Sequence, residues 1–256
     1  MREVTLRMAL ISVLQMSNLI LIRHGQSIWN LQNRFTGWYD VPLSDKGLLE
    51  ANTAGILIKK LNINVDFAYT SYLRRAIQTL QIILNVIEAQ DLDPVKAWEL
   101  NERHYGNLTG LNKNEMRKKI GEEQVRIYRR SWDIAPPAIS LEDDFNPRKD
   151  NVYKNLNPKN IPNTESLKDT YDRVIPYFEK NIKSKIIEEK NIIITAHGNS
   201  LRALCKKLFT ISDKKINELE IPTGNPLLIS MNSKFHILDS YYLDKSREQK
   251  LLINEQ

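Results

Sequence analysis

Two short runs of apolar residues near opposite ends of the chain have the length and branched composition of buried parallel strands. Leu19–Ile22 leads into an Arg-His-Gly sequence at residues 23–25, and Ile192–Ile194 leads through Thr-Ala into a His-Gly pair at residues 197–198. Each His-Gly pair therefore falls where a strand ends, at the carboxyl edge of the predicted sheet. Open α/β folds place their ligand crevices at that edge, so we expect the two histidines to face each other there.

The chain between these two runs begins with alternating helical and strand-like patterns. Ser44 is a suitable N-cap, and one later segment carries the apolar stripe Leu73, Ile77, Leu80 and Leu84. The elements predicted here are a helix from Ser44 to about Leu61, a strand over Asp66–Thr70, a helix over Leu73–Ala89 and a short strand over Val95–Trp98.

A less regular stretch follows. Five prolines and many Asn and Asp residues mark residues 134–163 as a long irregular excursion, and such insertions commonly form lids or binding loops. The other elements predicted in this half are a charged helical segment from Leu111 to about Trp132, a long helix from Thr164 interrupted near Pro176, a helix after the second His-Gly pair, and strands over Leu227–Met231 and His236–Tyr242.

This alternation predicts a three-layer α/β/α sandwich with a mostly parallel central sheet. We expect a single catalytic domain over residues 17–243, with a helical and irregular excursion at about 110–163, and a loose polar C-terminal tail over 244–256. Residues 1–16 resemble a short signal sequence, with basic residues before the apolar Met8–Leu14, but lack a small-residue cleavage site. The interpretation we favour is a non-essential extension, with Met16 as the true start.

Composition narrows the possible functions. The 256 residues are 41% hydrophobic and 27% charged, as in ordinary soluble globular proteins. The one cysteine, Cys205, excludes an intramolecular disulfide and a cysteine metal cluster, which favours a cytoplasmic location. No window has the length of a membrane span. The net charge of +6 comes from scattered lysines without interleaved aromatic residues, so we expect no nucleic-acid partner but one local anion site.

The residues around the two histidines suit phosphate chemistry. Arg23 offers a planar donor fork, and Gly25 lets the backbone turn sharply and approach a ligand closely. Arg74 and Arg75 follow a predicted strand, and because neighbours on a helix point about 100° apart, only one of them is expected to enter the site. Further candidate groups lie in residues 101–106 and at Lys113, Arg129 and Arg130. A lone strand-end histidine or surface cation is commonly structural; two His-Gly strand ends are hard to explain in that way.

A series of motifs extends this pattern over roughly Asn18 to Tyr242. They are Leu21–Ser27, Asn33–Val41, Leu43–Gly47, Thr70–Ala76, Leu100–Gly106, Gly110–Lys113, Arg129-Arg130, Arg173–Tyr177, Ala196–Ala203 and Ile221–Gly224. In these stretches the chain closely resembles the 2,3-bisphosphoglycerate-dependent phosphoglycerate mutases of the histidine phosphatase superfamily. The Arg-His-Gly motif is typical of the whole superfamily, whereas the Phe-Thr-Gly-Trp, Asn-Glu-Arg-His-Tyr-Gly and Gly-Asn-Ser-Leu-Arg-Ala blocks point to the glycolytic mutases.

The resemblance implies roles for individual residues. His24 matches the histidine that becomes phosphorylated, His197 its partner, and Glu102 the general acid and base. Arg23, Arg75 and a protonated His197 would surround the phosphoryl group. The full set of residues implied to bind substrate is Arg23, Gly25, Gln26, Ser27, Asn30, Thr36, Gly37, Arg75, Glu102, Arg103, His104, Tyr105, Lys113, Arg129, Arg130, Gly198 and Asn199, with Gln26 standing where many members have Glu.

The resemblance also implies an activity. The expected reaction is the interconversion of 3-phosphoglycerate and 2-phosphoglycerate through phosphohistidine, in glycolysis and gluconeogenesis. It would be primed by 2,3-bisphosphoglycerate, need no metal and take place in a cytoplasmic homo-oligomer, with a dimer favoured. The alternatives are a phosphatase or a bisphosphoglycerate synthase of the same superfamily, and a non-catalytic scaffold. The basic excursion argues against a simple phosphatase, and the presence of every reacting group argues against a scaffold.

Overall fold

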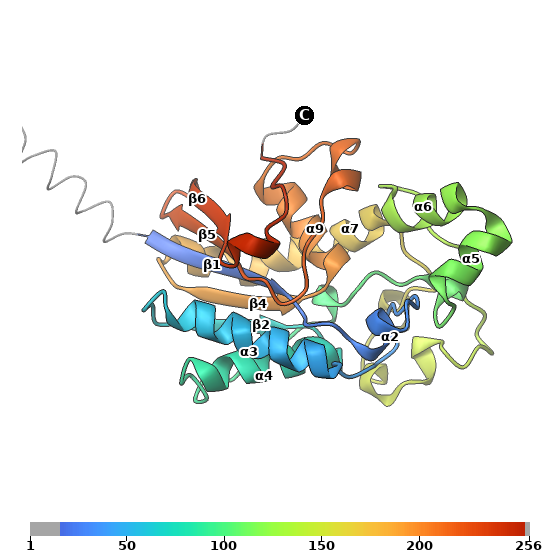
Figure 1. Cartoon of the computed structure of the whole chain (residues 1–256), viewed down its shortest axis with the longest axis horizontal. Coiled ribbons are helices and arrows are strands. Elements are labelled where there is room, and N and C mark those ends of the chain that lie inside the picture. Colours follow the sequence, from blue (N-terminus) through green and yellow to red (C-terminus); the bar gives the residue numbers. More distant parts are fainter. Residues whose placement is uncertain (1–15, 254–256) are drawn as a thin grey trace, which may run out of the picture.

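The computed structural model describes residues 16–253, which form a six-stranded sheet with the strand order β3-β2-β4-β1-β5-β6 (Figure 1). β3, β2, β4 and β1 run parallel to one another, whereas β5 runs antiparallel to β1 and to β6. This arrangement confirms the mostly parallel sheet. The strands are β1 Met16–Arg23, β2 Phe67–Thr70, β3 Val95–Lys96, β4 Ile192–Ala196, β5 Leu227–Asn232 and β6 Ile237–Tyr242.

Helices cover both faces of the sheet because the side chains of the central strands alternate between two apolar cores. Ile20 and Ile193 pack against α3 (Asp45–Lys59) and α4 (Arg74–Val86). Leu21 and Ile194 point to the other face, toward α7 (Leu167–Asn181), α8 (Lys183–Ile187) and α9 (Gly198–Leu208). Figure 1 shows α3 and α4 on one side of the strands and α7 and α9 on the other. The three-layer prediction is therefore confirmed.

Three predicted elements differ from the structure: α7, β3 and the charged segment that begins at Leu111. α7 begins at Leu167, capped by Ser166, and continues through Pro176 without interruption. Val174 and Phe178 on either side of the proline are fully buried, so packing outweighs the lost helix hydrogen bond. The predicted strand over residues 95–98 is shorter, because a 3₁₀ turn, η1 (Trp98–Leu100), follows Lys96.

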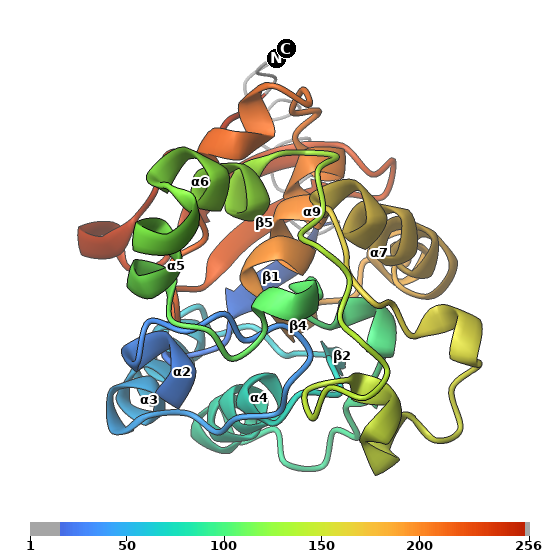
Figure 2. The same cartoon turned by 90° about the vertical axis from the view of Figure 1, so that its right-hand side faces the viewer.

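The charged segment predicted as one helix is two. α5 (Lys113–Ile120) and α6 (Glu122–Arg130) meet at Gly121, whose φ of 90° breaks the helix. In Figure 2 these two helices stand at the same end of the molecule as the short α2 (Ile28–Leu31). The excursion after α6 is irregular as predicted and carries only the 3₁₀ turns η3 (Pro147–Lys149), η4 (Asn151–Tyr153) and η5 (Pro158–Asn160). The other 3₁₀ turns are η2 (Gly106–Leu108), η6 (Lys215–Glu218) and η7 (Lys245–Arg247).

The C-terminal residues up to 253 pack on the domain, so the prediction of a loose tail is wrong for them. Leu252 is 1% exposed and belongs to the core beneath α9. Arg247 donates hydrogen bonds to the Thr223 and Gly224 carbonyls. At the other end, residues 1–15 of the predicted extension lie outside the described residues. From residue 16 to residue 253, no helix combines the length and the apolar content that crossing a membrane requires.

Candidate active site

The two strand-end histidines lie face to face at the carboxyl edge of the sheet. The parallel register pairs Arg23 with Ala196, and the His24 N–H donates to the Ala196 carbonyl over 3.0 Å. The two imidazole rings have their centroids 5.0 Å apart and their planes tilted by 59°. Both side chains are buried, His24 at 2% exposure and His197 at 0%. The predicted meeting of the two His-Gly ends therefore occurs.

The hydrogen bonds of His24 define which ring nitrogen can react. Its Nδ1 lies 2.6 Å from the Gly25 carbonyl oxygen, which can only accept, so Nδ1 carries the proton. Nε2 is thereby left with its lone pair and faces the Arg75 Nε donor at 3.3 Å. A neutral imidazole held in this tautomer is a competent nucleophile at Nε2.

His197 is held by a residue that the sequence analysis did not assign. Its Nε2 lies 2.7 Å from the Ser71 hydroxyl, which also accepts the Leu73 N–H at 3.1 Å. Ser71 is fully buried just after β2, so it fixes the His197 ring from the neighbouring strand end. The available signal was a hydroxyl-rich pair at that strand end, but the partner lies 126 residues away in the chain.

Burial keeps both histidines neutral. Removal from water, followed by repulsion from Arg75, lowers the pKa of His24 and of His197 well below 6.5. The imidazolium form of His197 is disfavoured because it would be buried beside guanidinium groups that already carry charge. The protonation of His197 beside a phosphoryl group, which the resemblance implies, stays a prediction.

Arg75 and Arg23 supply the fixed positive charge next to the histidines. Arg75 is 1% exposed, and its Nη1 and Nη2 donate to the Tyr39 and Gly37 carbonyls, which holds the guanidinium against His24. Burial lowers its pKa to about 10, so it stays charged at neutral pH. Arg74 instead points outward to Asp40, so only one of the adjacent pair enters the site. Arg23 is fixed by a 2.8 Å bond from Nη1 to the Ile221 carbonyl.

Glu102 stands at the N-terminus of α9, beside the histidines. Its Oε1 accepts hydrogen bonds from the Asn199 backbone N–H at 3.2 Å, the Asn199 side-chain amide at 2.8 Å and the Arg103 N–H at 2.8 Å. The Asn199 amide also contacts the Tyr105 hydroxyl at 3.2 Å. The carboxylate is thus oriented by two donors of Asn199 at the N-terminus of α9 and by one backbone donor from its own loop.

Residues from α5 and α6 complete a strongly cationic cleft. Lys113, Arg129 and Arg130 line it together with Arg23 and Arg75, and Arg34 and Arg202 also line it. These seven cations face only two carboxylates, Glu102 and Glu220, so the cleft is suited to a multiply charged anion. Burial lowers the pKa of Lys113 to about 8. Burial, the largest single effect, would raise the pKa of Tyr105, but the charge and hydrogen bond of Arg103, which lies over its ring, together with the charge of Arg129 lower it to about 8.

Most of the predicted site residues line this cleft, and some do not. Those that line it are Arg23, His24, Asn30, Thr36, Gly37, Arg75, Glu102, Tyr105, Lys113, Arg129, Arg130, Gly198 and Asn199. Cleft residues that the prediction omitted are Arg34, Phe35, Arg202, Glu220 and Ile221. Four of these residues fall within the quoted motifs, which was a usable signal, and Glu220 immediately precedes the Ile221–Gly224 motif.

Five residues predicted to bind substrate lie behind the lining. Gly25 packs against Gly47, and Ser27 caps α2. The Gln26 side chain accepts a hydrogen bond from Ser44. Arg103 donates to the Tyr128 and Arg129 carbonyls at the end of α6, and His104 accepts the Gly106 N–H. Their contacts hold the loops and helices that carry the lining.

The site combines two facing histidines with buried guanidinium groups and a positioned carboxylate, all at the edge of a parallel sheet. This combination defines a histidine-based phosphoryl-transfer site. The chain belongs to branch 1 of the histidine phosphatase superfamily, whose family model matches residues 19–159 and 140–241. Among the residues from 16 to 253, no group of three or more His, Cys, Asp or Glu side chains is arranged to hold a metal ion.

Known proteins similar to this chain agree with that membership. A 2,3-bisphosphoglycerate-dependent phosphoglycerate mutase of Pelagibacter ubique is 52% identical over 93% of this chain and 100% of its own length. The enzyme of the same name from Hamiltonella defensa is 51% identical over 90% and 92%. Among solved structures, a phosphoglycerate mutase of Bacillus anthracis matches with a TM-score of 0.65 and 21% identity, over 91% of this chain and 98% of that one, which shows the shared fold.

Proposed function

We propose that this protein is a 2,3-bisphosphoglycerate-dependent phosphoglycerate mutase that interconverts 3-phosphoglycerate and 2-phosphoglycerate through a phosphohistidine at His24. The observation that carries the proposal is the His24 Nε2 lone pair, which faces His197 and Arg75 inside a cleft with seven cations and two carboxylates. The mutases of P. ubique and H. defensa, about half identical over nearly the whole chain, support the same activity.

The reaction divides into two transfers at His24. The bisphosphoglycerate primer supplies the phosphoryl group that His24 Nε2 carries at the start of a cycle. The phosphorylated His24 gives this group to the 2-hydroxyl of 3-phosphoglycerate, while Glu102 takes the hydroxyl proton. His24 then accepts the phosphoryl group from the 3-position, and Glu102 returns the proton to that oxygen. The product is 2-phosphoglycerate, and the phosphohistidine is regenerated.

Arg23, Arg75 and His197 stabilise the phosphoryl group in flight. Its negative charge spreads over three equatorial oxygens, and preorganised donors around it lower the barrier without reorganisation. The negative charge of this group counteracts the burial and the repulsion from Arg75 that lower the pKa of His197. His197 therefore takes up a proton when the phosphoryl group binds, and becomes the third donor.

The α5 and α6 cations hold the rest of the substrate. Lys113, Arg129 and Arg130 line the same cleft as His24, where they would hold the carboxylate and the second phosphate. Closure of this part of the cleft would keep water from the phosphohistidine, which otherwise would hydrolyse. We further infer one catalytic domain over residues 17–243 in a cytoplasmic homo-oligomer, in which Cys205 stays a buried thiol and catalysis needs no metal.

A coupled assay tests the proposal. The formation of 2-phosphoglycerate from 3-phosphoglycerate is measured with and without added 2,3-bisphosphoglycerate, in the presence of a chelator, and phosphate release is followed in parallel. We expect isomerisation that depends on the primer, is unaffected by the chelator and far exceeds phosphate release. Phosphate release as the main reaction would instead identify a phosphatase, and loss of activity in chelator would contradict the proposed metal-free mechanism.

A further inference from the structure

The backbone of the His24 loop is held from several sides, and one of its supports is a buried charge. The Gly25 N–H donates to the Thr79 hydroxyl at 3.1 Å, and the Gln26 N–H donates to Glu50 Oε2 at 2.8 Å. The Glu50 side chain on α3 is only 10% exposed. A carboxylate this buried needs compensation from nearby donors and cations.

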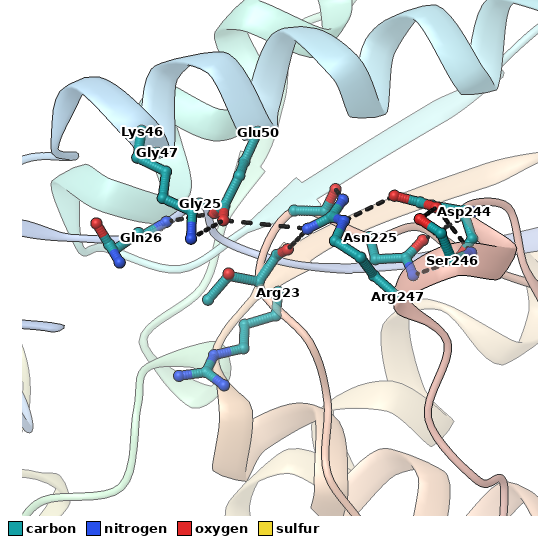
Figure 3. Close-up of polar contacts among 12 residues, drawn as sticks. Arg23, Gly25, Gln26, Lys46, Gly47, Glu50, Asn225, Asp244, Ser246 and Arg247 are labelled. Atoms are coloured by element: carbon teal, nitrogen blue, oxygen red, sulfur yellow. Dashed lines mark hydrogen bonds and ion pairs between the residues drawn. The ribbon is translucent and has the colours of Figure 1, made fainter. Parts of the chain in front are cut away.

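Arg247, from the C-terminal turn η7, lies at this buried carboxylate. Its Nη1 is 4.0 Å from Glu50 Oε1 and 3.0 Å from the Thr223 carbonyl. Its Nη2 donates to the Gly224 carbonyl at 3.4 Å, and its Nε donates to Asp244 at 2.7 Å. One planar guanidinium thus joins three segments of the chain: α3, the turn at 223–224 and η7 (Figure 3).

The segment around the 223–224 turn forms hydrogen bonds with Arg23, so it links Arg247 to Arg23. The Gly224 N–H donates to the Arg23 carbonyl at 2.9 Å, and the nearby Ile221 carbonyl accepts from the Arg23 guanidinium at 2.8 Å. Gly224 has a φ of 58°, and a Cβ there would come within 2.6 Å of Glu50 Cβ, so the turn packs directly on α3. In Figure 3 the Arg23 side chain points away from Glu50 and Arg247, so these two residues act on it through the backbone.

The C-terminal turn is itself built to hold Arg247 in place. The fully buried Asn225 side chain donates to the Asp244 carbonyl and accepts the Asp244 N–H, both at 3.0 Å. The Asp244 carboxylate caps η7 by accepting the Ser246 N–H. Neither Glu50 nor Arg247 lines the catalytic cleft. Their contacts therefore serve the loop and not the substrate.

We propose that Arg247 is a positioning residue for phosphoryl transfer, which holds Arg23 and the His24 loop in place through Glu50 and the 223–224 turn. The inference rests on the proposed function. Removing the guanidinium loosens the loop from the side opposite the substrate. Because small displacements of reacting groups cost large factors in rate, we expect Arg247→Ala to lower kcat about tenfold. The cations of α5 and α6 are untouched, so KM for 3-phosphoglycerate should change less than about twofold.

The experiment distinguishes an effect on the positioning of the reacting groups from a loss of folded protein, because it counts the active sites. Each variant is phosphorylated with labelled 2,3-bisphosphoglycerate, and kcat is expressed per phosphorylated site. Lys245→Ala is the matched control, because Lys245 lies on the same turn but pairs outward with Glu248 at 3.5 Å. Arg247→Lys keeps the charge beside Glu50 but cannot reach three acceptors at once, so its kcat should stay at least threefold below that of the wild type.

The outcomes are distinct. A tenfold loss of kcat per site in Arg247→Ala, with Lys245→Ala unchanged, supports the proposal. An Arg247→Ala variant that only unfolds at lower temperature and keeps the wild-type kcat per site would overturn it. A fully active Arg247→Lys variant would also overturn it, because charge alone would then suffice. If the wild-type protein itself formed no 2-phosphoglycerate, the proposed function would fail instead.

Discussion

His24 and His197 face each other across 5.0 Å at the ends of two neighbouring parallel strands, and only His24 presents a nitrogen lone pair to a guanidinium donor. His197 instead uses Nε2 to contact Ser71. The two rings therefore have different surroundings although both follow the same strand–His–Gly pattern. This difference supports the proposed nucleophilic attack by His24 and the proposed role of His197 in stabilising the transferred group.

The first prediction tests that assignment. His24→Ala should lower mutase activity by about four orders of magnitude or more, the scale seen when a nucleophile is removed. The same variant should take up no acid-labile label from 2,3-bisphosphoglycerate. Activity is measured by coupling 2-phosphoglycerate to its consumption, and the label by acid treatment of the isolated protein.

His236 provides a matched control, because it is exposed beside β6 and lies outside the cleft. His236→Ala should retain wild-type activity and labelling. Undiminished acid-labile labelling in His24→Ala would show that another residue carries the phosphoryl group.

A second prediction concerns stability against pH. Burial lowers the pKa of His24, His104 and His197, that of His104 to about 3. Below their ordinary pKa of 6.5 the unfolded chain binds protons that the folded protein does not. The free energy of unfolding therefore has its full histidine contribution above about pH 6.5 and falls as the pH drops, by about 1.4 kcal/mol per pH unit for each histidine.

His104→Asn isolates one of these contributions, since an amide oxygen can replace His104 Nδ1 as acceptor for the Gly106 N–H. The difference in unfolding free energy between pH 7.5 and pH 5.5, measured with urea, should shrink by about 1.4 kcal/mol in this variant. An unchanged difference in His104→Asn would mean that His104 is protonated in the folded protein as readily as in the unfolded chain.

The sequence predicted the structure best where a feature depends on residues that are close together in the chain. Strand-end histidines after Leu19–Ile22 and Ile192–Ile194 could be placed because apolar runs of that length pair in parallel and end at one edge. The contact of Ser71 with His197 joins positions 126 residues apart, and no local pattern encodes it. Pro176 misled the prediction because a local rule for helix ends was outweighed by the tertiary burial of its neighbours.

The same limit explains the C-terminal residues. Their composition is polar, which locally indicates a solvated tail. Arg247 nevertheless donates hydrogen bonds to the 223–224 turn, and the Leu252 side chain is buried in the core. Polar composition predicts exposure only when no distant segment offers partners. Glu220 likewise belongs to none of the quoted motifs. Its place in the cleft becomes evident only from its ion pair with Arg130.

A third prediction concerns the close packing beneath His24. A Cβ on Gly25 would lie 2.3 Å from the Gly47 carbonyl oxygen, and one on Gly47 would lie 2.1 Å from the Gln26 carbonyl oxygen. Both obstacles are backbone atoms that cannot rotate away. Gly25→Ala should therefore lower the free energy of unfolding by about 1–3 kcal/mol, as overpacking does in other proteins. Urea unfolding at neutral pH measures the change.

Gly198→Ala is the control for this test. The nearest atoms to a Cβ there belong to the Arg23 side chain at 3.6 Å, an ordinary contact. Its unfolding free energy should differ from that of the wild type by less than about 1 kcal/mol. Equal unfolding free energies for Gly25→Ala and Gly198→Ala would show that the His24 loop can move away from the start of α3 without loss of stability.

The last prediction concerns Glu220, the second carboxylate of the cleft. It forms an ion pair with Arg130 at the end of α6, with the two side chains 48% and 22% exposed. A pair this open to solvent contributes at most about 1 kcal/mol, so a substrate anion can displace it. Under the proposed function, Glu220 would therefore compete with the substrate for Arg130. Removing its charge in Glu220→Gln should lower KM for 3-phosphoglycerate by up to about fivefold, with kcat nearly unchanged.

Steady-state kinetics at low and moderate salt test this competition. The advantage of Glu220→Gln should shrink as salt screens the ion pair. Glu218→Gln is the matched control, since Glu218 pairs with Lys215 at 3.8 Å and does not line the cleft. A raised KM in Glu220→Gln would reverse the interpretation, because Glu220 would then hold Arg130 in its binding position. In that case the carboxylate would assist substrate binding by orienting α6, and the loss should persist at moderate salt.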